Sequence, residues 1–169
     1  MKQPDTTYRL QLSPQFTLEE LDKILDYLDD FGITTIYSAP LFQAREGSTH
    51  GYDVLDPYLI NKEIGDLEKL KSIAERLNQK SMCWLQDIVP NHMAFDSKNP
   101  WMRDIFELGP RSPFYNFFDI DWEYKNLKKV LAPFLGNSLE EVIENRELSL
   151  NLDDSGIYFK YFENNFPVS

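Results

Sequence analysis

Cysteine, histidine and glycine are scarce in this chain, whose 169 residues include one cysteine, two histidines and seven glycines. A lone cysteine excludes a disulfide framework within the chain and a cysteine-ligated zinc site, so Cys83 is expected to pack in the core. Long apolar runs are missing too: no stretch reaches the roughly eighteen residues of a membrane helix, and residues 1–12 hold no apolar signal region. We therefore expect a cytoplasmic protein that has no membrane partner.

Basic residues are also few, with 17 Lys and Arg against 28 Asp and Glu, and the formal net charge is −11. A surface of this sign repels phosphate backbones, and no cluster of Lys and Arg interrupts it, so nucleic acid is not an expected partner. The hydrophobic share of 42% and the aromatic share of 14% are spread along the chain. This composition is typical of a folded domain and excludes general disorder.

Short apolar strands alternate with amphipathic helices in the first half of the chain. One helix begins at the capping box of Thr17 and Glu20 and ends at Gly32, and a second begins at Asp66. Strands are predicted at residues 8–12, 33–37 and 82–89. The order strand, helix, strand, helix, strand predicts an α/β fold with parallel strands.

Two regions depart from this alternation. Residues 41–65 show no periodicity and are too long for a simple connection, so they are predicted to form a functional loop. Beyond His92 the chain becomes aromatic-rich and irregular, which indicates an excursion from the sheet. The elements predicted there are a helix at 101–108, a helix opened by Ser138 and Glu141, and a hairpin of 147–152 and 157–162 around a turn at 153–156.

Polar residues gather where the third predicted strand ends, in the segment Asp87-Ile88-Val89-Pro90-Asn91-His92. Ligands of parallel α/β folds bind beyond the carboxyl ends of the strands, and a buried aspartate is costly unless it is paired or hydrogen-bonded. The segment is therefore a candidate site. Its spacing alone also allows a simpler interpretation, in which Asp87 and Asn91 cap a turn and His92 starts a loop.

The segment Asp87 to His92 resembles the first signature region of the α-amylase superfamily of glycoside hydrolases. His50-Gly51-Tyr52, in the long loop after the second predicted strand, resembles the same superfamily in the same order. Further runs resemble the family of maltooligosyl trehalose synthases in particular. These runs are Thr7 to Leu12, Ser38 to Arg45, Gly47 to Val54, Asn99 to Trp101 and Phe117 to Trp122, so the resemblance extends from Thr7 to the end of the chain.

The resemblance implies a TIM (β/α)₈ barrel, with its first three βα units in residues 1–92 and an α+β excursion after strand three in 93–169. It implies an enzyme of trehalose biosynthesis that converts the reducing-end α-1,4 bond of a maltodextrin to an α,α-1,1 bond by intramolecular transglycosylation, without a cofactor. The substrate-binding residues it implies are His50, Tyr52 and His92, and the site-organising residues are Asp87 and Asn91. Asn91 matches a position that helps to hold calcium in many amylases, but the other ligands cannot be located, so no metal site is predicted.

Retaining glycosidases need two carboxyl groups about 5 Å apart, a nucleophile and an acid/base. The resemblance places both at strands four and five, downstream of strand three, so no catalytic residue is expected in this chain, and the isolated chain is expected to be inactive. Two alternatives stay open. The chain could belong to another α-amylase-type glucan hydrolase or transglycosidase, or it could be a non-catalytic glucan-binding module.

Five aromatic residues after the third strand also allow two interpretations. A sugar-stacking platform is one, because aromatic rings suit the apolar faces of glucose, and a packing cluster is the other and the favoured one. The residues are Tyr115, Phe117, Phe118, Trp122 and Tyr124.

Overall fold

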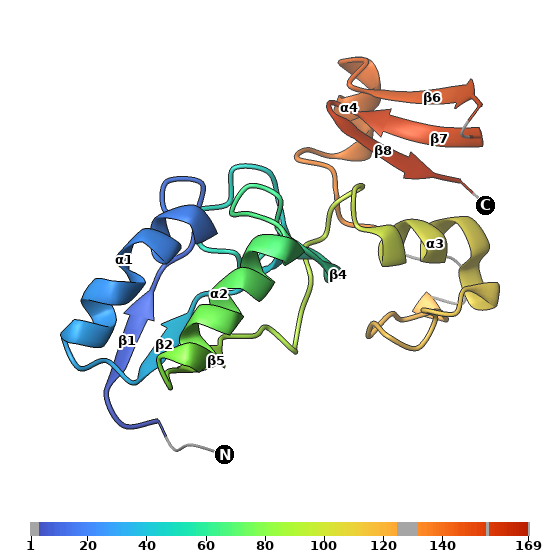
Figure 1. Cartoon of the computed structure of the whole chain (residues 1–169). Helices are drawn as coiled ribbons and strands as arrows, with labels where there is room; N and C mark the ends of the chain where they lie inside the picture. The colour runs from blue at the N-terminus through green and yellow to red at the C-terminus, as the bar shows by residue number, and fades with distance from the viewer. Residues whose placement is uncertain (1–3, 125–131, 155, 169) are drawn as a thin grey trace. The chain divides into compact units, whose positions relative to one another are not determined.

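The computed structural model describes residues 4–124, 132–154 and 156–168 (Figure 1). The chain divides into a first unit, Met1–Ala94, and a second unit, Phe95–Ser169. Each unit has a three-stranded sheet of its own, parallel in the first unit and antiparallel in the second.

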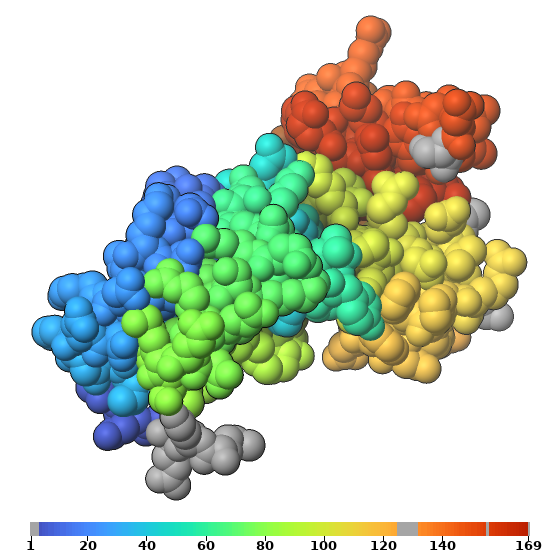
Figure 2. Space-filling model, in the orientation of Figure 1, coloured from blue at the N-terminus to red at the C-terminus, as the bar shows by residue number. Residues whose placement is uncertain are grey.

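The parallel sheet of the first unit has the strand order β1-β2-β5. Its strands are β1 (Thr7–Leu10), β2 (Thr35–Ser38) and β5 (Cys83–Gln86), and the helices that precede β2 and β5 are α1 (Leu18–Asp30) and α2 (Leu67–Gln79). Both strand pairs are parallel, which confirms the direction predicted from the element order. The two helices lie side by side over the strands (Figure 1), and Figure 2 shows the blue surface of α1 next to the green surface of α2.

Local capping residues set the ends of both helices. Thr17 caps α1 and forms the predicted capping box with Glu20, while the Asp66 side chain accepts a hydrogen bond from the Lys69 backbone N–H at 2.8 Å. Gly32 follows α1 with φ +83°, a conformation that favours glycine and ends the helix. The predicted helix starts are therefore confirmed at these residues.

An aliphatic core lies between the helices and one face of the sheet. The apolar stripe of α1 is fully buried at Leu18, Leu21 and Leu25, and Ile36 of the central strand is buried against it. This is the pattern expected when a helix with apolar residues three and four apart covers a parallel sheet.

The stretch 41–65, which we predicted as a functional loop with no strand in it, contains a pair of antiparallel strands. These are β3 (Phe42–Ala44) and β4 (Val54–Ile60). The three-residue β3 is too short to show alternation, the pairing register shifts twice, and Pro57 within β4 is a residue that normally argues against a strand. The third parallel strand is also shorter than predicted, since β5 ends at Gln86 and Asp87 lies beyond it.

The second unit contains the helices and the hairpin predicted for it. Its elements within the described residues are α3 (Pro100–Leu108), the 3₁₀ turn η1 (Gly109–Arg111), α4 (Leu139–Glu144), β6 (Leu148–Asp153), β7 (Gly156–Tyr161) and β8 (Asn164–Pro167). The capping box of Ser138 and Glu141 opens α4 as predicted. Residue 155 of the predicted turn lies outside the described residues, and β8, which pairs with β7, was not predicted.

Aromatic rings form much of the interior of the second unit. Phe166 of β8 lies 4.2 Å from Phe134 between ring centroids and 6.0 Å from both Phe95 and Phe106. A second group joins Trp101 to Phe114 at 5.1 Å. Distances in this range are typical of packed aromatic pairs.

Candidate functional site

The carboxyl end of the parallel sheet carries the candidate site. Asp87 follows β5 directly, and its backbone N–H donates to the Ser38 carbonyl at the end of β2. Side chains alternate across a strand. Because Leu10, Ile36 and Trp84 belong to the core beneath the helices, their neighbours Arg9 and Tyr37, which pair in register, occupy the opposite face.

Three side chains converge on the carboxylate of Asp87. The Tyr52 hydroxyl donates to Oδ2 at 2.5 Å, the Tyr37 hydroxyl lies 3.4 Å from the same oxygen, and Arg9 Nη2 lies 3.7 Å from it. The Asp87 side chain is 17% exposed, so its charge is largely withdrawn from water. A carboxylate in this position is stable because hydrogen bonds and a nearby cation satisfy it.

The pKa of Tyr52 reflects this arrangement. Its hydrogen bond to Asp87 raises the pKa of the phenol above its ordinary value, and partial burial acts in the same direction. Arg9 Nη2 donates to the phenol oxygen at 3.1 Å and opposes the rise. The phenol therefore remains a proton donor at neutral pH, with its oxygen accepting from Arg9 and its proton directed at Asp87.

The loop between β3 and β4 presents Tyr52 through a tight turn. The Tyr52 backbone N–H donates to Nδ1 of His50 at 3.0 Å, and the two rings are stacked with centroids 6.0 Å apart. Since Nδ1 accepts, the proton of the neutral imidazole resides on Nε2. Gly51 has φ +75°, and a side-chain carbon there would lie 3.0 Å from the Pro40 carbonyl oxygen, so the turn needs glycine.

The alpha-amylase catalytic domain family matches residues 17–165. The chain belongs to this family. A Mycobacterium tuberculosis (strain CDC 1551 / Oshkosh) protein, named provisionally as a maltooligosyl trehalose synthase, is 36% identical over 139 residues, which cover 78% of this chain and 18% of that protein. An intracellular maltogenic amylase of Bacillus subtilis (strain 168) is 36% identical over 96 residues, which cover 57% of this chain and 16% of the amylase.

A crystal structure of maltooligosyl trehalose synthase is similar to this chain with a TM-score of 0.90 and 34% sequence identity. The similarity covers 98% of this chain and 22% of that structure. The chain thus spans about a fifth of the length of these alpha-amylase family relatives.

Among the five sugar-site residues predicted in this alpha-amylase family chain, the structure brings three together. Tyr52 is bonded to Asp87, and His50 accepts the Tyr52 backbone N–H. Asn91 and His92 are exposed and follow Asp87 by four and five residues. Within the part of the chain that the structure describes, no hydrogen bond joins either of them to the cluster of Tyr52 and Asp87.

Arg9 and Tyr37 are members of the cluster that the sequence reasoning did not assign to the site. The Arg9 guanidinium carbon lies 5.3 Å from the centroid of the Tyr37 ring, within the range of a cation–π contact. A signal was available in the sequence, because Arg9 and Gln11 are polar residues that alternate with buried leucines at the end of the first strand. Finding their partners required the register of β1 against β2.

The aromatic residues after the third strand pack largely against one another. Tyr115 stacks on Trp122 at 4.3 Å, and Phe117 meets Trp101 and Phe114 edge to face at 5.2 and 5.6 Å. These contacts favour the packing interpretation over a sugar-stacking platform.

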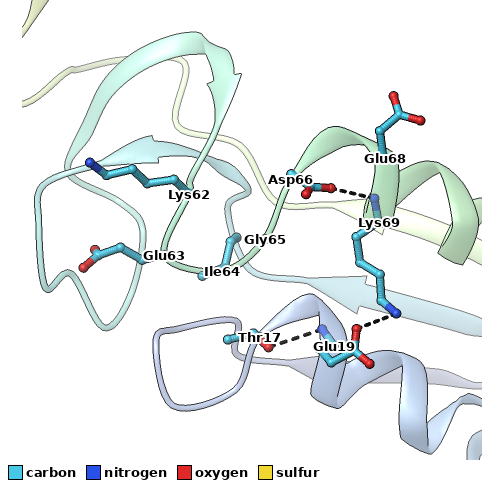
Figure 3. Close-up of a pocket in the computed structure, with 9 residues that line it drawn as sticks. All are labelled: Thr17, Glu19, Lys62, Glu63, Ile64, Gly65, Asp66, Glu68 and Lys69. Carbon is cyan, nitrogen blue, oxygen red and sulfur yellow. Dashed lines mark hydrogen bonds and ion pairs between the residues drawn. The ribbon is translucent and has the colours of Figure 1, made fainter.

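A surface pocket of 520 Å³ lies beside the amino ends of α1 and α2 (Figure 3). Its lining residues are Thr17, Glu19, Lys62, Glu63, Ile64, Gly65, Asp66, Glu68 and Lys69. Lys69 Nζ is paired with Glu19 at 2.6 Å, and Asp66 and Thr17 are used as helix caps. Thr17 and Asp66 of this pocket thus serve the helix ends, Glu63 accepts from the Gly47 backbone N–H, and Glu68 pairs with Lys71, so the cluster around Asp87 is the stronger candidate site.

In the residues that the structure describes, no three histidine, cysteine, aspartate or glutamate side chains gather so that they could hold a metal ion, and the side chain of Asn91 is exposed. No helix in the same residues is long and apolar enough to cross a bilayer.

Proposed function

We propose that this chain carries the first three βα units of a (β/α)₈ barrel, in residues 1–92, and an excursion after the third strand in residues 93–169. The whole enzyme would convert the reducing-end α-1,4 bond of a maltodextrin to an α,α-1,1 bond by intramolecular transglycosylation. The observation that carries the proposal is the hydrogen bond of 2.5 Å from Tyr52 to Asp87, at the carboxyl ends of parallel strands. Ligands of such sheets bind at this edge.

Each predicted residue has a role in the proposal. The Tyr52 ring stacks on a glucose unit at the cleaved bond, and its orientation is fixed at one end by Asp87. His50 accepts the Tyr52 backbone N–H through Nδ1 and keeps its Nε2 proton for a sugar hydroxyl. His92 binds a second hydroxyl, and Asn91 organises the segment that carries it. The exposure of both residues is compatible with contact to a ligand.

Asp87 is not assigned to bond cleavage. Retaining glycosidases use two carboxyl groups about 5 Å apart, one as nucleophile and one as acid/base. The Asp87 carboxylate instead accepts hydrogen bonds from Tyr52 and lies beside Arg9, so it acts as a fixed acceptor that orients the ring. We propose that the nucleophile and the acid/base belong to downstream strands, and that the 169-residue chain binds glucan without cleaving it.

Maltohexaose tests this proposal in two ways. Incubation with the isolated chain is expected to yield no trehalose-ended product, and calorimetric titration is expected to give saturable binding. Tyr52→Ala should weaken that binding about tenfold, because a stacked aromatic face is lost. Tyr27→Ala removes another exposed tyrosine from α1 and should leave binding unchanged. Turnover by the isolated chain, or equal binding by the two variants, would contradict the proposal.

A hydrolytic amylase is the second candidate, because the maltogenic amylase relative is as similar in sequence over its shorter match. The same arrangement of Tyr52 and Asp87 would serve hydrolysis, so this site alone does not separate the two reactions. Products of the complete enzyme would do so: trehalose-ended oligosaccharides favour the transglycosylation, and free maltose without them favours hydrolysis. Retained glucan binding in a complete protein that produces neither product would favour a non-catalytic binding module.

A further inference from the structure

Strand β1 and the residue that follows its end by one position, Gln11, present two polar side chains on the sheet face that the helices leave uncovered. Arg9 and Gln11 are two residues apart, so they point to the same side, and Arg9 Nη1 donates to Gln11 Oε1 at 3.0 Å. This bond orients the Gln11 amide, because the oxygen is turned toward Arg9 and the two N–H donors are turned away from it.

The oriented amide of Gln11 reaches the loop that carries Tyr52. Its Nε2 lies 3.3 Å from the carbonyl oxygens of both Thr49 and His50. These residues immediately precede Gly51, where the loop turns with positive φ. Gln11 therefore holds the backbone of the loop at the turn, 38 and 39 residues away in sequence.

Arg9 reaches the same loop through a side chain. Its Nη2 donates to the Tyr52 hydroxyl at 3.1 Å and lies 3.7 Å from Asp87 Oδ2, while the guanidinium lies over the Tyr37 ring. One guanidinium thus contacts Gln11 through one nitrogen and the Tyr52 phenol through the other. Arginine suits this position because its planar fork supplies several donors in a fixed geometry.

We propose that Arg9 and Gln11 are positioning residues that fix the loop from Ser48 to Asp53 and set the tilt of the Tyr52 ring for a glucan. Gln11 fixes the backbone at one end of the turn, and Arg9 fixes the phenol at the other. The role in glucan binding rests on the proposed function. We call the contacts of Arg9 and Gln11 with the loop the clamp. The clamp belongs to the chain itself and can be measured without a sugar.

The clamp is tested first through the ionisation of Tyr52. In the full chain labelled with ¹³Cζ-tyrosine, Tyr52→Phe assigns the resonance and a pH titration gives the pKa. Arg9 lowers the pKa that Asp87 raises, so Arg9→Met is expected to move the pKa of Tyr52 further upward, and Arg9→Lys to restore part of the shift. Arg111→Met removes a guanidinium from the second unit and is expected to change nothing. An unmoved Tyr52 titration in Arg9→Met would overturn the role of Arg9.

The role of Gln11 is tested by a substitution that keeps the size and shape of the side chain. Gln11→Glu retains an acceptor for Arg9 but loses both amide donors, so the carbonyls of Thr49 and His50 lose their partner. Amide hydrogen exchange of Ser48 to Asp53 is expected to be about fivefold faster, the equivalent of one ordinary hydrogen bond. Gln15→Glu, an exposed glutamine outside the sheet, controls for the added charge. Equal exchange rates in the two variants would overturn the role of Gln11.

Glucan affinity connects the clamp to the site. Arg9→Met and Gln11→Glu are each expected to weaken maltohexaose binding about fivefold, and Arg9→Lys to recover part of it. If the unaltered chain binds no maltohexaose, the proposed function fails while the titration and the exchange rates still decide the clamp. If the unaltered chain binds maltohexaose and Arg9→Met and Gln11→Glu bind it as tightly as the unaltered chain, the positioning role is wrong and the proposed function stands.

Discussion

The two units of the chain bury their interiors by different means. The first unit uses aliphatic residues at helical spacing, and four of them have no exposed surface: Leu18, Leu21, Leu25 and Ile73. The second unit relies on rings from separate segments, with Phe166 at the centre of contacts to Phe95, Phe106 and Phe134. A periodic stripe spreads burial over many similar contacts, whereas a ring cluster concentrates it in a few residues.

Exposed apolar residues sharpen this contrast. On the antiparallel sheet of the second unit, Leu150 is 64% exposed and Leu152 is 76% exposed, although both share a face with buried Tyr161 and Phe166. Only part of that face is covered within the unit. The second unit should therefore depend more heavily on each residue that it does bury.

Removal of Phe166 is the most severe test of this contrast. Phe166 is 5% exposed, and Phe166→Ala is expected to lower the free energy of unfolding by about 4 kcal/mol, the usual range for a buried phenylalanine. Leu152→Ala, on the same sheet but exposed, should change it by less than about 0.5 kcal/mol. Urea denaturation measures both, and similar losses for the two variants would show that the ring cluster does not hold the unit together.

Leu25 provides the corresponding test in the first unit. Leu25→Ala removes a fully buried side chain from α1 and is expected to cost about 3 kcal/mol. The effect is smaller than for Phe166 because neighbouring leucines in the stripe remain in place. Leu67→Ala, at an exposed position in α2, is the control. Hydrogen exchange followed by segment should locate the loss in the first unit, and a larger loss than for Phe166→Ala would reverse the proposed order.

The same contrast explains which parts of the fold were predictable. Helix starts at Thr17, Asp66 and Ser138 were predicted because a cap and its partner lie within three residues of each other. Strand β8 was missed because the sequence Asn-Asn-Phe-Pro shows no alternation and contains proline. Strands β3 and β4 were missed because their pairing register shifts and one of them has only three residues. Local rules do not contain the cross-strand contacts that create these elements.

The candidate site also has residues that the sequence predicted and residues that it did not. Tyr52 and Asp87 were singled out by their motifs, and the structure joins them across 35 residues of sequence. The contributions of Arg9 and Tyr37 depend on the parallel register of β1 and β2, which pairs these two residues. No pattern within one strand specifies its register against another. A resemblance can thus name residues of a site, while the partners that orient them come from the fold.

The charged seam between α1 and α2 gives the first unit a support that its aliphatic core does not supply. Lys69 Nζ donates to Asp22 Oδ2 at 2.7 Å, and Arg76 contacts the other carboxylate oxygen. The bond from Lys69, followed by the contact with Arg76, lowers the pKa of Asp22 below its ordinary value, although partial burial opposes the shift. A carboxyl group whose pKa is lower in the folded state stabilises the fold most above its ordinary pKa.

Asp22→Asn is therefore expected to have the smallest and the most pH-dependent effect. Near pH 7 it should lower the free energy of unfolding by about 1 kcal/mol, a modest value because water screens a seam at the surface. The difference in stability between the unaltered chain and Asp22→Asn should shrink as the pH falls below 4 and passes through the lowered pKa of Asp22. There the unaltered carboxyl takes up a proton and loses the interaction that the variant also lacks. Asp30→Asn, an exposed carboxyl at the end of α1, should show little difference at either pH. Urea denaturation at several pH values across this range measures the free energy of unfolding of each protein. A difference between the unaltered chain and Asp22→Asn that stays constant with pH would mean that the charge of Asp22 does not stabilise the helix pair.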